Sequence, residues 1–136
     1  MNNQIITLSS TEIDGTIQKL QIDDFFVIEL DGKKIINEEQ YVLEMKSKLN
    51  IEADFPKPVI GWLNDYLCDL SWISNCKIAI VIRNFDMFLR DNEKKKRDII
   101  LDFDEIILPW WEKEVEEHMV GGQRKTFLVY LEQSVE

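Results

Sequence analysis

Apolar residues along the chain fall into short runs of two different periods, and these predict an alternation of strands and helices. Dense runs of β-forming residues at 25–30, 77–82 and 126–131 predict three strands. The run at 77–82 is almost continuously apolar, which is typical of a strand covered on both faces, so we expect it at the centre of a sheet. Asp31 and Gly32 follow the first run and predict a turn.

Segments with an apolar period near 3.6 lie between these runs and predict helices. Asn37, followed by two glutamates, is expected to cap a helix that runs to about Leu49. A long helical segment is expected after the basic run 94–97, ending at Gly121-Gly122, and Pro109 either kinks it or begins a second helix. Its apolar stripe comprises Ile99, Ile100, Phe103, Ile106, Ile107, Trp110 and Trp111.

The order of the predicted elements is strand, helices, strand, helix, strand, which favours parallel pairing with right-handed crossovers. We therefore expect an α/β fold with a small parallel three-stranded sheet packed with helices. Residues 1–20 are expected to form an N-terminal arm or an extra strand, and residues 21–136 a single domain. A chain of 136 residues is long enough to bury one core.

The segment 59–73 is interpreted as one amphipathic helix with an unusual exposed side. At about 100° per residue, an apolar arc faces away from a side that carries aromatic and acidic residues together. The apolar arc is Ile60, Leu63, Leu67 and Leu70, and the opposite side is Trp62, Asp65, Asp69 and Trp72. Large aromatic side chains beside fixed carboxylates are typical of a surface that binds a basic protein. The two prolines in residues 55–58 predict an extended loop that leads into this helix.

Other interpretations of the same residues remain open. Trp72 is also compatible with a partly buried core position, and Trp62 with a place along the helix surface beside Tyr66. Asp65 and Asp69 are compatible with ordinary solvated charges, or with an acid and base pair in an enzyme. A deep pocket around both aspartates would favour the enzyme, whereas an inhibitor should present them on a convex ridge.

Composition and charge narrow the class of partner. The chain is 45% hydrophobic and 31% charged, as in globular proteins, and its net charge is -10. Such a charge repels phosphate backbones and anionic membranes and attracts basic proteins, so we expect a protein partner and no direct binding of nucleic acid or membrane. The N-terminus lacks the pattern of a signal peptide, and we expect a cytoplasmic protein.

The sequence contains few of the residues that catalytic or metal sites require. It carries no phosphate-binding loop, zinc-protease motif or nucleophile elbow. Cys68 and Cys76 do not have metal-ligand spacing, and His118 is the single histidine. We therefore expect no metal, no cofactor, no small-molecule substrate and no catalytic residues.

Two stretches point to a known family. Residues 27–35, Val-Ile-Glu-Leu-Asp-Gly-Lys-Lys-Ile, look like the family's opening strand and turn. Residues 63–72, Leu-Asn-Asp-Tyr-Leu-Cys-Asp-Leu-Ser-Trp, are similar to a helix of one branch of the family and are the more specific match. Over residues 24–132 the chain thus resembles barstar-like proteins, the intracellular inhibitors of secreted bacterial ribonucleases.

The resemblance implies a non-enzymatic inhibitor or immunity protein, an antitoxin that inserts this helix and the preceding loop into the cleft of its nuclease. Asp65 would then replace a substrate phosphate among basic residues of the partner. The expected partner-binding residues are Trp62, Asn64, Asp65, Asp69 and Trp72.

The stretch 58–62 lacks the Tyr- and Gly-containing loop and the Asn-x-Asp that the family usually has before this motif. The expected partner is therefore a basic ribonuclease or another toxin. The alternative is an acidic interaction module of the same fold whose partner is not a nuclease.

Overall fold

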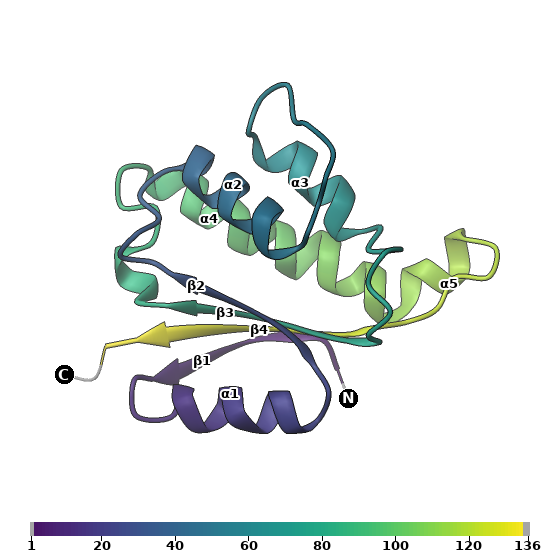
Figure 1. Ribbon diagram of the computed structural model, residues 1–136, viewed down its shortest axis with the longest axis horizontal. Coiled ribbons are helices and arrows are strands. Elements are labelled where there is room, and N and C mark those ends of the chain that lie inside the picture. Colours follow the sequence, from purple (N-terminus) through teal and green to yellow (C-terminus); the bar gives the residue numbers. More distant parts are fainter. Residues whose placement is uncertain (1, 135–136) are drawn as a thin grey trace.

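A four-stranded parallel sheet in the order β1-β4-β3-β2 organises the protein, with helices over both faces (Figure 1). The computed structural model describes residues 2–134. The strands are β1 (Gln4–Ser9), β2 (Phe26–Asp31), β3 (Lys77–Arg83) and β4 (Thr126–Gln133). The α/β class and the parallel pairing are confirmed, but the prediction of three strands is wrong, because the sheet has four.

The additional strand comes from the N-terminal segment. β1 pairs with β4 in parallel, from Gln4 beside Leu128 to Ser9 beside Gln133. Helix α1 (Ile13–Ile22) then covers the face of the sheet opposite the other helices (Figure 1). This small second core comprises Ile13, Ile17 and Leu20 of α1 with Ala79, Val81, Leu128 and Tyr130 of the sheet. A division of the chain near residue 20 stays a prediction.

The two central strands are buried on both faces, as the continuous apolar run at 77–82 predicts. In β3, Ile78, Ile80 and Ile82 belong to the main core, whereas Ala79 and Val81 face α1. This alternation follows from the two-residue period of side chains along a strand. Both layers of helices therefore pack on the same pair of strands.

The main core lies between the sheet and three helical units. These are α2 (Glu38–Lys48), α3 (Ile60–Leu67) and a long helical segment that follows the short turn η1 (Phe85–Met87). The long segment consists of α4 (Glu93–Asp102), η2 (Phe103–Ile107), η3 (Trp110–Glu114) and α5 (Val115–His118). Within residues 2–134 no helix combines the length and the apolar character that a membrane span requires.

The long segment continues through Pro109, which keeps helical φ and ψ angles of −63° and −34°. The wider π-helical turns η2 and η3 flank it, and a wider turn relieves the clash between a proline ring and the preceding turn. Because of the same widening, the prediction that Ile106 belongs to the buried apolar stripe is wrong. Ile106, within η2, is 50% exposed, because an extra residue per turn shifts the following side chains away from a 3.6-residue period.

The predicted cap of α2 gives a first testable expectation. The Asn37 side chain accepts a hydrogen bond from the backbone N–H of Gln40 at 2.9 Å. Asn37→Ala should lower the free energy of unfolding by about 1 kcal/mol, because a helix amide loses its acceptor. Urea unfolding of the variant measures this loss, and Asn37→Asp, which keeps an acceptor, should restore most of it. Equal loss in both variants would contradict the capping role.

Candidate partner-binding site

Helix α3 is held in place by side chains from its neighbours. Val59, at its N-cap, provides no side-chain acceptor, and the Ile60 amide instead donates to Glu38 Oε2 of α2 at 3.0 Å. Lys95 Nζ of α4 lies 3.9 Å from the same carboxylate. At the other end, Trp111 Nε1 donates to the Leu67 carbonyl at 2.7 Å. These contacts fix α3 relative to α2 and to the long helical segment.

The prediction of one helix over 59–73 is wrong, because α3 ends at Leu67. The amides of Asp69 and Leu70 donate to the Tyr66 carbonyl at 3.0 and 3.1 Å and close a turn. Leu70 has a φ of 48°, a left-handed conformation that costs a residue other than glycine about 1–2 kcal/mol. Its fully buried side chain offsets that cost. Asp69 and Trp72 therefore lie on the segment after the helix.

Both aspartates expected to bind a partner are exposed. Asp65 lies on α3, and Asp69 lies on the following turn. Within residues 2–134 neither carboxylate accepts a hydrogen bond or takes part in a salt bridge. Both are free to meet donors from another molecule.

Asn64 has a different environment from the two aspartates. It is half-buried, and its amide donates to Asp102 Oδ2 of α4 at 2.9 Å. This bond joins the middle of α3 to the long helical segment. The residue therefore positions α3, and a direct contact of Asn64 with a partner stays a prediction.

The aromatic side chains form one continuous strip along α3, which we call the aromatic strip: Phe55, Trp62, Tyr66 and Trp72. Phe55, from the proline-containing loop, lies 6.3 Å from Trp62 and stacks on Tyr66 at 5.3 Å between ring centroids. Tyr66 meets Trp72 edge-on at 6.1 Å. Trp62 is 43% and Trp72 39% exposed, and the Trp72 indole N–H donates to the Leu49 carbonyl at 2.7 Å. Trp72 thus packs on the end of α2 and still shows surface to a partner.

Asp69 also borders a hollow of about 420 Å³ on the side of the turn that faces the end of the long helical segment. Cys68, Trp110 and Arg124 are among the residues that line it, whereas Asp65 does not. Among the described residues no group of three His, Cys, Asp or Glu side chains is placed to hold a metal ion. The two aspartates therefore do not share the lining of this hollow.

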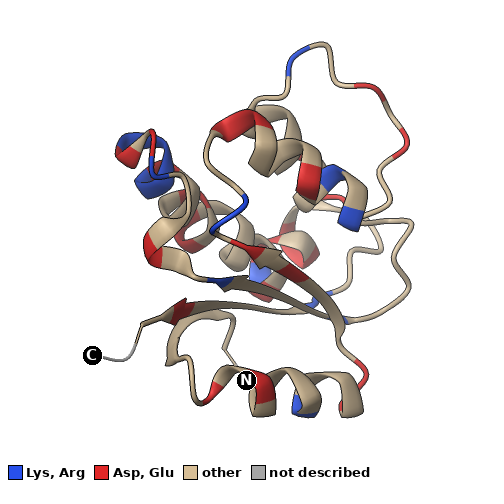
Figure 2. Cartoon of the chain, turned by 60° about the vertical axis from the view of Figure 1, so that its left-hand side comes forward, with Lys and Arg blue, Asp and Glu red and all other residues tan. Residues whose placement is uncertain are grey.

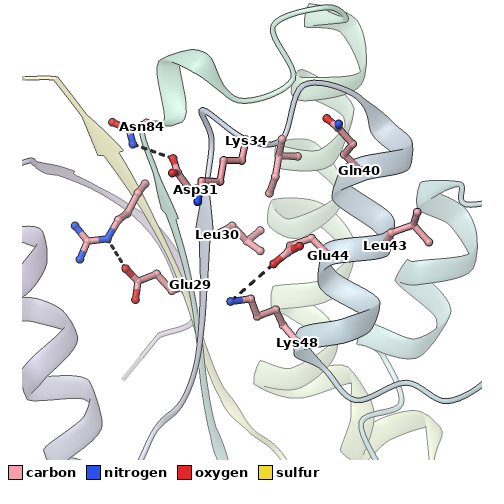
Figure 3. Close-up of a pocket in the computed structure, with 11 residues that line it drawn as sticks. Glu29, Leu30, Asp31, Lys34, Gln40, Leu43, Glu44, Lys48 and Asn84 are labelled. Atoms are coloured by element: carbon pink, nitrogen blue, oxygen red, sulfur yellow. Dashed lines mark hydrogen bonds and ion pairs between the residues drawn. The ribbon is translucent and has the colours of Figure 1, made fainter.

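Another hollow, of about 640 Å³, lies between β2 and α2 (Figure 3). Its three acids are already engaged within the protein. Glu29 pairs with Arg83, and Glu44 lies 3.8 Å from Lys48. Asp31 accepts a hydrogen bond from the side-chain amide of Asn84 at 3.0 Å. The bond from Asn84 lowers the pKa of Asp31. The contacts of Glu29 and Asp31 join β2 to the end of β3, whereas the contact of Glu44 lies within α2.

The basic run of residues 94–97 lies at the start of α4 (Figure 2). Lys94 pairs with Asp98, Lys95 lies near Glu38, and Lys96 Nζ lies 4.4 Å from the centre of the Phe85 ring. Three of the four side chains therefore meet groups of the same chain.

The two cysteines differ in their expected reactivity. Burial raises the pKa of Cys68 to about 11, and the nearby carboxylates of Asp65 and Glu114 add to this shift, whereas Cys76 is exposed. Because the thiolate is the reactive form, Cys68 should be alkylated at least about tenfold more slowly than Cys76 at pH 8. Iodoacetamide labelling of Cys68→Ser and Cys76→Ser measures the two rates. Equal rates would show that Cys68 is more open than its environment indicates.

One family model matches residues 25–132 of the chain, and its description is Barstar (barnase inhibitor). The matched region contains α2, α3, the aromatic strip and the long helical segment, whereas β1 and α1 precede it. No significant match was found among curated proteins or among solved structures.

Proposed function

Because the chain belongs to the family of barstar, the barnase inhibitor, we propose that it is an acidic inhibitor of a basic ribonuclease. In this proposal α3 and the turn after it occupy the active site of the ribonuclease and exclude RNA. The observation that carries the proposal is Asp65, an exposed carboxylate without a partner in the described chain, on a helix fixed from both ends. A carboxylate presented in this way can take the place of an RNA phosphate.

The chemistry of that replacement is direct. Arginine and lysine side chains that bind a substrate phosphate also bind a carboxylate through charge-assisted hydrogen bonds. Asp65 supplies the acceptor, and Asp69 supplies a second negative charge one short turn away. No bond of the inhibitor needs to break, so the protein acts by occupying the site.

Rigidity of α3 supports the same proposal. Binding costs less when the contact groups are already in their bound positions. Glu38 caps the first turn of α3, Asn64 ties its middle to Asp102, and Trp111 donates to its last residue. The helix backbone that carries Asp65 is therefore already in place in the free protein, and association needs little ordering of the backbone.

The remaining surface fits a basic target. A net charge of -10 accelerates the encounter with a positively charged protein, and this effect weakens as salt is added. Trp62 and Trp72 supply partly exposed aromatic surface, which is enriched at the energetic centre of interfaces. The proposed contact residues are thus Trp62, Asp65, Asp69 and Trp72, with Asn64 at their base. A cytoplasmic location and an immunity role are part of this proposal.

Titration of ribonuclease activity tests the function. Barnase and the ribonucleases secreted by the source organism are each mixed with increasing amounts of the purified protein, and cleavage of a fluorescent RNA is followed. We expect activity of at least one of these enzymes to fall linearly to zero at one equivalent of protein. Full activity of every enzyme at a large excess of the protein would contradict the proposal.

A further inference from the structure

A hollow of about 400 Å³ lies beside the aromatic strip, apart from the two aspartates of the proposed contact. It forms where the end of α2 meets α3 and the segment after it. Its lining consists of Asn50, Ile51, Glu52, Ala53, Tyr66 and Trp72.

The walls of this hollow are fixed by the way in which α2 ends. Asn50 has a φ of 57°, and the Ile51 amide donates to the Lys46 carbonyl at 3.0 Å, which closes the last turn. The Ile51 side chain is buried, and the Trp72 indole is held by its bond to Leu49. The hollow is therefore preformed in the free protein.

The lining selects for a particular chemical group. Two aromatic rings and small apolar surfaces border a single acidic side chain, Glu52, which is exposed. A planar cation on an apolar stem suits such a site, because it can stack on the rings and donate to the carboxylate at the same time. Another ring of the aromatic strip already makes such a cation–π contact, because Lys46 Nζ lies 5.8 Å from the centre of the Phe55 ring.

We propose that this hollow is a subsite for an arginine side chain of the partner. Its guanidinium stacks against Trp72 and Tyr66, and its N–H groups donate to Glu52. The identity of the partner rests on the proposed function, whereas the affinity of the hollow for arginine does not. Asp65 would then bind any ribonuclease that has a basic catalytic cleft. The Glu52 subsite would favour those ribonucleases that also carry an arginine beside this cleft, where it can reach the hollow.

Titration of the full chain with N-acetyl-arginine amide tests the subsite without the partner. The indole N–H resonance of Trp72 is followed by NMR, and the resonance of Trp62 serves as an internal reference. We expect the Trp72 signal to shift and to saturate. N-acetyl-citrulline amide has almost the same shape without the charge, and we expect it to bind at least about fivefold more weakly.

Two variants assign the effect to Glu52. Glu52→Gln should lower the affinity for the arginine derivative to that for the citrulline derivative. Asp23→Asn removes the same charge from an exposed residue at the end of α1, on the other face of the sheet, and should leave the affinity unchanged. The proposal is overturned if no saturable shift occurs at Trp72, if citrulline binds as well as arginine, or if Glu52→Gln has no effect.

The outcome separates this subsite from the proposed function. Asp65→Ala should leave the titration with N-acetyl-arginine amide unchanged. Normal arginine binding without inhibition of any ribonuclease would contradict the proposed function alone. Stoichiometric inhibition without arginine binding would contradict the subsite alone.

Discussion

Replacement of Asp65 with alanine is expected to weaken binding to the inhibited ribonuclease by about 2–5 kcal/mol, roughly 30-fold to several-thousand-fold in affinity. The loss has two sources, because the variant lacks the carboxylate and leaves basic groups of the ribonuclease buried without a partner. The free protein should keep its stability, since the Asp65 side chain is exposed and makes no hydrogen bond or salt bridge within residues 2–134. Calorimetric titration measures the first quantity and urea unfolding the second.

The matched control for this variant is Asp23→Ala, which removes one exposed aspartate from the opposite side of the sheet. It changes the net charge equally and should alter affinity little, apart from a small effect on the association rate. Equal affinities of Asp65→Ala and Asp23→Ala for the ribonuclease would contradict the role of the Asp65 carboxylate in the contact. Unfolding of Asp65→Ala would assign a structural role to the residue.

Replacement of Leu67 with alanine should have the opposite profile and lower the free energy of unfolding by about 2–5 kcal/mol. The Leu67 side chain is fully buried in the main core, and its removal leaves a cavity that the surrounding side chains fill only in part. Its backbone carbonyl accepts the Trp111 indole N–H, so relaxation of α3 around the cavity is limited. Urea unfolding followed by circular dichroism measures the change.

Leu101→Ala provides the matched control for Leu67→Ala. Leu101 lies on α4 and is 49% exposed, so the same substitution should cost well under half as much. Under conditions in which Leu67→Ala stays folded, it should still inhibit the ribonuclease, because Leu67 faces the core. Similar losses of stability in both variants would contradict the assignment of Leu67 to the core.

Much of the fold could be predicted because its signals are local. The three dense β-forming runs correspond to β2, β3 and β4, and Asn37 caps α2 as its position before two glutamates predicts. The signal of the fourth strand is weaker, because its β-forming run covers only residues 5–8, and the sequence left open whether residues 1–20 form an arm or an extra strand. β1 has six residues, as β2 does, and it gains its place in the sheet by pairing with β4, from the opposite end of the chain. Such a long-range pairing leaves little trace in the local sequence pattern.

At two places the backbone departs from a regular α-helix, and there the helices differ from those predicted. In sequence, Leu70 continues the apolar arc of residues 59–73, yet its backbone is left-handed, which is rare for leucine. A left-handed position is usually predicted from a glycine or an asparagine, and neither stands here. Ile106 fits a period of 3.6 but lies in a π-helical turn. Burial of Leu70 and the insertion of Pro109 into a packed helix are tertiary effects, which a periodic pattern does not contain.

The candidate site was only partly accessible from sequence. Trp62 and Asp65 could be placed on the exposed side of α3 because the helical period there is clear. Glu52 was missed, since its hollow is built from the end of α2 and from residues after α3. Asn50 directly after the predicted helix end is a signal for a left-handed cap, and it could have located one wall of the hollow. The roles of all these residues in binding stay predictions.

Competition between the protein and an active-site mononucleotide for the inhibited ribonuclease tests the central claim most directly. The apparent dissociation constant of the protein–ribonuclease complex is measured at increasing nucleotide concentrations. If α3 and Asp65 occupy the phosphate-binding groups of the cleft, the apparent dissociation constant should rise in proportion to the nucleotide concentration once the ribonuclease is saturated with it. An apparent dissociation constant that does not change, with nucleotide and protein bound together, would contradict occupation of the active site.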